Sequence, residues 1–158
     1  MDKPSSDAQF AVWRHAMIGS PGPPPDEDMG TRVYWGDLQP LREPRALPPP
    51  DRVWSEREWQ IIRRGHVPAD MDDKWVAFVE HDRLYLHRSW TGDQLFQADF
   101  QPCDQGWQVI RAAAESRGRW RKRKYARSDR LLLELLIDTV LLGTYDEVRW
   151  RRLWELEN

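Results

Sequence analysis

Hydrophobic and polar positions alternate with a period of two through the middle of the chain. The alternation covers residues 74–80, 83–90, 94–100 and 107–112, and turn residues such as Asp82 and Gly92 separate the segments. Strict alternation indicates strands, and short connections between strands favour hairpins. The pattern therefore predicts a three- to four-stranded antiparallel meander.

The first of these segments is apolar on both sides. Trp75, Ala77 and Val79 would point to one face, and Val76 and Phe78 would point to the other. A strand with apolar residues on both faces is typically covered on both. We therefore expect other elements to pack against the sheet.

Three segments have helical patterns. Ser55 and Glu58 have the spacing of a capping box, and Gly65 and Pro68 would end a helix over 56–64. Residues 131–142 are apolar around the whole helical wheel, which predicts a buried helix. Residues 146–157 read as an amphipathic helix. The predicted fold class is α+β, with the helix over 131–142 packed on the sheet and the helices over 56–64 and 146–157 flanking it.

The first fifty residues differ from the rest. Proline clusters at 21–25 and 48–50 exclude long helices and central strands there. We expect residues 1–50 to be a proline-rich, partly disordered arm and residues 51–158 to be a single domain. Within the arm, Phe10, Trp13 and Met17 have near-helical spacing, and residues 33–35 could add a short strand.

Composition narrows the classes of function. The chain has 158 residues, 32% of them charged, and a formal net charge of −2, which argues against a protein that coats nucleic acid over its whole surface. A single cysteine, Cys103, fits a reducing compartment, and no segment suits a secretory signal or a membrane span. We therefore expect a cytoplasmic protein that makes no contact with a membrane. Most of the ten tryptophans should lie in the core.

Few residues have the spacing of known catalytic or metal sites. The four histidines and Cys103 match no zinc motif, so we expect no metal and no cofactor. Glu134 and Asp138 lie one helical turn apart. They could form an acid–base pair, but the favoured interpretation is the solvated stripe of a core helix.

A basic segment precedes the apolar helix. Basic and aromatic side chains alternate over residues 117–127, as a surface for phosphates and stacked bases would require. A nucleic-acid-binding function is therefore one alternative. Its candidate residues are Arg119, Trp120, Arg121, Lys122, Arg123, Lys124 and Tyr125.

The segment over residues 71–92 places polar side chains on strands that should be buried. Tyr85, His87 and Ser89 would share one face, and Arg88 would lie on the opposite face, where it could bind a carboxylate or phosphate. The competing interpretation is internal: Arg88 pairs with Glu80 or an acidic residue in 70–73, and His87 is a core histidine. The internal interpretation is favoured for these two residues taken alone.

This segment resembles a motif of small uncharacterised bacterial proteins. The similarity rests on Asp73-Lys74-Trp75, on the hairpin string from Leu84 to Gly92, and on a leucine-rich helix that ends at Gly143. It covers about residues 54–143 and leaves out the proline-rich arm and the basic segment. Relatives occur beside ADP-ribose-processing domains, so the resemblance implies a link to nucleotide-type substrates.

The leading hypothesis is a small binding module for a phosphate-bearing ligand or a protein partner. Its candidate ligand-binding residues are Lys74, Tyr85, His87, Arg88, Ser89 and Trp90. The alternative is an enzyme that acts on a nucleotide or ADP-ribose-type substrate, with Glu80 or His87 as general base.

Overall fold

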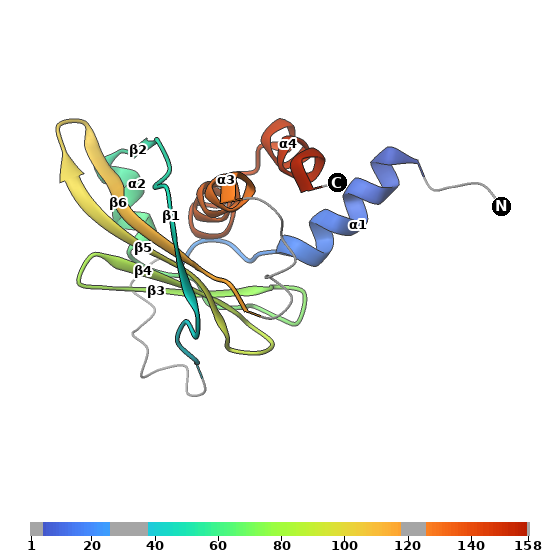
Figure 1. The fold of residues 1–158 in the computed structure, drawn as a ribbon, viewed down its shortest axis with the longest axis horizontal. Helices are drawn as coiled ribbons and strands as arrows, with labels where there is room; N and C mark the ends of the chain where they lie inside the picture. The colour runs from blue at the N-terminus through green and yellow to red at the C-terminus, as the bar shows by residue number, and fades with distance from the viewer. Residues whose placement is uncertain (1–4, 26–37, 118–125, 158) are drawn as a thin grey trace.

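The computed structural model describes residues 5–25, 38–117 and 126–157 (Figure 1). The α+β fold class is confirmed, with helices packed on one antiparallel sheet. The elements in chain order are α1 (Ser6–Ile18), β1 (Pro44–Leu47), β2 (Val53–Trp54), α2 (Glu56–Ile62), β3 (Trp75–Glu80), β4 (Arg83–Arg88), β5 (Gln94–Cys103), β6 (Gly106–Glu115), α3 (Ala126–Leu136), the π-helix η3 (Ile137–Leu141) and α4 (Glu147–Glu157).

The sheet has six strands, two more than the longest predicted meander. Strands β3, β4, β5 and β6 form the expected meander, and β1 extends it in the order β1-β6-β5-β4-β3. Strand β2 pairs with the other end of β6. Four and two residues are too short for an alternation to show, and prolines at 44 and 48–50 conceal β1 in the sequence.

The capping box of α2 forms as predicted. The Glu58 backbone N–H donates to Ser55 Oγ at 3.1 Å, and the Ser55 N–H donates to Glu58 Oε1 at 2.9 Å. The tryptophans on either side of the cap, Trp54 and Trp59, are both buried and pack on Phe100. The helix start is thereby fixed to the sheet through β2 and β5.

Helices α3, α4 and α1 lie on the same side of the sheet, with α3 nearest to it (Figure 1). The predicted burial of the apolar helix is confirmed, since Leu132, Leu133 and Leu136 have no exposed surface. Its second half, η3, is a π-helix, a distortion that the apolar pattern does not reveal. The core therefore lies between α3 and the inner face of the sheet.

Parts of the segment predicted as an arm belong to this core. Helix α1 buries Phe10, Met17 and Ile18, and the Trp75 indole N–H donates to the Met17 carbonyl at 2.9 Å. Residues 33–35, where a short strand was expected, lie outside the described residues. Among the described helices, none has the length and apolar character needed to cross a membrane.

A candidate anion-binding cavity

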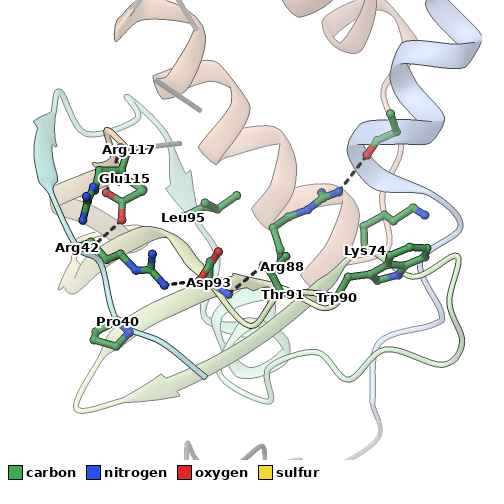
Figure 2. Close-up of a pocket in the computed structure, with 11 residues that line it drawn as sticks. Pro40, Arg42, Lys74, Arg88, Trp90, Thr91, Asp93, Leu95, Glu115 and Arg117 are labelled. Atoms are coloured by element: carbon green, nitrogen blue, oxygen red, sulfur yellow. Dashed lines mark hydrogen bonds and ion pairs between the residues drawn. The ribbon is translucent and has the colours of Figure 1, made fainter. Parts of the chain in front are cut away.

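A cavity of about 680 Å³ opens where the C-terminus of α1 meets the turn between β4 and β5 (Figure 2). Residues 40–42, which precede β1, and the end of β6 complete its wall. We call it the cationic cavity. Its lining residues are Ala16, Pro40, Arg42, Lys74, Arg88, Trp90, Thr91, Asp93, Leu95, Glu115 and Arg117.

Four of these lining residues are cations, whereas only two are acids, Asp93 and Glu115. One lining aromatic ring, that of Trp90, is 66% exposed, the most exposed tryptophan among the described residues. Figure 2 shows Arg42, Glu115 and Arg117 at one end and Lys74 and Trp90 at the other. The wall therefore carries an excess of positive charge together with one open stacking surface.

The β4–β5 turn fixes the middle of the cavity. The Arg88 N–H donates to the Asp93 carbonyl at 2.9 Å, and the Gly92 N–H donates to the Arg88 carbonyl at 2.8 Å. Gly92 has a φ of 76°, a conformation that glycine adopts without strain. The tight turn directs Trp90, Thr91 and Asp93 into the wall.

Trp90 and Lys74 are held together at the open end. The Trp90 indole N–H donates to the Met71 carbonyl at 2.9 Å, and Lys74 Nζ lies 4.9 Å from the centre of a Trp90 ring. This cation–π contact keeps the ammonium group near the ring. The sequence predicted both residues as ligand-binding, and both line the cavity.

Arg88 lines the cavity but has internal partners. Its guanidinium donates to the Met17 carbonyl at 3.0 Å and to the Ala16 carbonyl at 3.2 Å, and it lies over the Trp75 ring. The partners expected in the sequence were Glu80 or an acid in 70–73. The guanidinium instead satisfies carbonyls at the C-terminus of α1, which have no partner within the helix.

The predicted polar row does not reach the cationic cavity. Tyr85 stacks on Phe78 with ring centres 4.7 Å apart, His87 Nδ1 lies 2.8 Å from the Gly92 carbonyl oxygen, and Ser89 Oγ donates to the Asp73 carbonyl. None of the three is among the lining residues. His87 is buried, as the internal interpretation requires. These side chains bond within the protein because the second sheet face is packed.

The candidate general bases are also outside the cavity. Glu80 is half-buried at the end of β3, and His87 is 2% exposed beneath the Phe78 ring. Neither lines the cavity. The geometry brings neither carboxylate nor imidazole of this pair to a ligand held there.

Glu134 and Asp138 do not form the solvated stripe favoured from the sequence. Asp138 is 5% exposed and accepts a hydrogen bond from the Trp54 indole at 3.0 Å, with Arg52 and Arg149 beside it. Glu134 pairs with Arg149. The stripe meets arginines from β2's flank and α4 because η3 packs against both elements.

Sequence reasoning missed three residues of the wall. Arg42, Arg117 and Glu115 come from segments more than seventy residues apart, which only the pairing of β1 with β6 brings together. No local pattern could have singled them out. The seven basic and aromatic candidates in 119–125 lie outside the described residues.

The described residues contain no group of three or more histidine, cysteine, aspartate or glutamate side chains arranged to hold a metal ion. Comparison of the chain with models of protein families, with curated proteins and with solved structures finds no match. The resemblance to small bacterial proteins therefore stays a prediction.

Proposed function

We propose that the protein is a binding module for a phosphate-bearing small molecule, which it holds in the cationic cavity. The observation that carries the proposal is the composition of the wall: Arg42, Lys74, Arg88 and Arg117 surround about 680 Å³ of space beside the exposed Trp90. Guanidinium and ammonium groups are the usual protein partners of phosphate. A volume of this size accommodates a small organic ligand.

Two of the cations are available to a ligand. Arg42 is exposed, and its only described ion pair is a loose contact with Asp93 at 3.5 Å. Lys74 lies at the opposite end over the Trp90 ring. A ligand with a charged group can therefore displace weak surface contacts, each worth about 1 kcal/mol or less, without opening the core.

The alternative of an enzyme acting on a nucleotide-type substrate gains no support from this wall, because Glu80 and His87 lie elsewhere. The proposal is accordingly one of binding.

Titration calorimetry with pyrophosphate tests the proposal on the full chain. We expect saturable binding that weakens as salt is raised, and a loss of about tenfold in affinity in the double variant R42A/K74A, since two charged contacts of roughly 0.7 kcal/mol each are removed. The matched control is R57A/R111A, which removes two exposed arginines that do not line the cavity. Absence of saturable binding, or an equal loss in the control, would refute the proposal.

A further inference from the structure

One of the two acids in the cationic cavity seems at first to oppose an anionic ligand. Glu115, the last residue of β6, lines the cavity and is only 7% exposed. A buried carboxylate beside a bound phosphate would repel it, unless the charge is already satisfied by other groups.

Backbone N–H groups satisfy it. The Arg42 N–H donates to Glu115 Oε1 at 2.8 Å, and the Glu43 N–H donates to Oε2 at 2.9 Å. From the other side, the N–H groups of Ser116 and Arg117 donate to Oε2 at 3.0 and 3.3 Å. One carboxylate thus holds two segments of chain that are more than seventy residues apart.

These contacts also keep the carboxylate ionised. Burial raises the pKa of Glu115, but the four backbone hydrogen bonds outweigh it, so that the pKa lies below its ordinary value. The negative charge is directed at the peptide groups. The two residues whose backbones it fixes, Arg42 and Arg117, are cations of the same wall.

We propose that Glu115 is the positioning residue of the cationic cavity: by binding the backbones of Arg42 and Arg117 it sets where their guanidinium groups meet a ligand anion. The inference rests on the proposed function and names the residue on which its geometry depends. It makes an unusual prediction about sign. Simple electrostatics says that removing a negative charge strengthens anion binding, whereas loss of a positioning residue weakens it.

The variant E115Q separates the two effects. Its amide NH₂ group would face backbone donors that need an acceptor, so the two segments should separate. We expect pyrophosphate affinity to fall about fivefold to tenfold, and no further fall when E115Q is added to R42A/R117A. The control E43Q removes an exposed carboxylate nearby, which is paired with Arg117 at 3.5 Å, and should not weaken binding.

Amide hydrogen exchange of the same proteins is the second readout. In E115Q the amides of Arg42, Glu43 and Arg117 should exchange faster, while those of the central strand β5 keep their protection. The wild-type chain provides the same test without a variant, because these amide signals should follow the titration of the Glu115 carboxyl group as pH falls.

The possible failures are distinguishable. If the wild-type chain binds no pyrophosphate, the proposed function is wrong and the positioning role falls with it, even where exchange shows that Glu115 holds both segments. If the wild-type chain binds but E115Q binds equally well or more tightly, or if its amides exchange as in wild type, the positioning role alone is overturned.

Discussion

Two buried aspartates show how local donors decide the behaviour of a carboxyl group. Asp73 has no exposed surface and accepts hydrogen bonds from Gly22 N–H at 3.0 Å, from Ala69 N–H at 3.2 Å and from His66 Nε2 at 2.8 Å. Burial raises the pKa of Asp73, but these bonds lower it further, to below its ordinary value. For Asp138 burial outweighs the Trp54 and Arg52 contacts, so its pKa is raised.

The pKa of Asp73 implies a defined acid dependence of stability. Because its folded-state pKa lies below its unfolded value, the stabilisation is complete above the unfolded pKa and is lost as pH falls through the folded pKa, below the ordinary value of 3.8. The variant D73N should lower the free energy of unfolding at neutral pH by about 3 kcal/mol, since it breaks a buried pair. It should also flatten the loss of stability in acid.

Urea denaturation at several pH values measures both effects. The control D104N changes an exposed aspartate in the β5–β6 turn and should leave the stability and its pH profile unchanged. A D73N profile parallel to that of wild type would show that Asp73 does not carry this acid dependence.

The sequence indicates individual residues of the site only where a local pattern exposes them. Lys74, Arg88 and Trp90 are polar or aromatic residues in a segment of strands and turns, and all three line the cavity. The contact between His66 and Asp73 has no such signal, because one lies at the free edge of β3 and the other in the loop before it.

At the scale of elements, periodicity predicts what repeats and misses what is short. The meander β3 to β6 and the helices α2 and α4 follow from alternation, capping and amphipathic spacing. The additions β1 and β2, and the π-helix η3, depend on tertiary pairing. These are the parts that complete one wall of the cavity and bury Asp138.

Arg88 links two elements and allows a test at this scale. Its guanidinium binds the last carbonyls of α1, so R88A should weaken the attachment of that helix by about 1–2 kcal/mol through lost hydrogen bonds to buried acceptors. Hydrogen exchange over residues 6–18 should become about tenfold faster while β5 stays protected.

The control R111A removes an exposed arginine of β6 whose side chain is 75% exposed. It should leave exchange in α1 unchanged. Equal protection of α1 in R88A and wild type would show that the contacts with Trp150 and Trp154 alone hold the helix.

At the scale of the whole molecule, the cationic cavity is a product of chain topology. Its wall combines residue 16, residues 40–42, the turn at 88–93 and the end of β6. Antiparallel pairing of β1 with β6 brings Arg42 and Arg117 to the same end, opposite Lys74 (Figure 2). An account of function from sequence alone could name part of this wall, but the complete site required the fold.

The most direct test of the central claim is a pyrophosphate titration of the ¹⁵N-labelled full chain, followed by NMR. Shifts should saturate at the Trp90 indole and at the backbone amides of Arg42, Thr91 and Arg117, while the indole signals of the buried Trp54 and Trp150 stay in place. No saturable shift at these positions, or shifts centred on another part of the chain such as residues 119–125, would contradict the account.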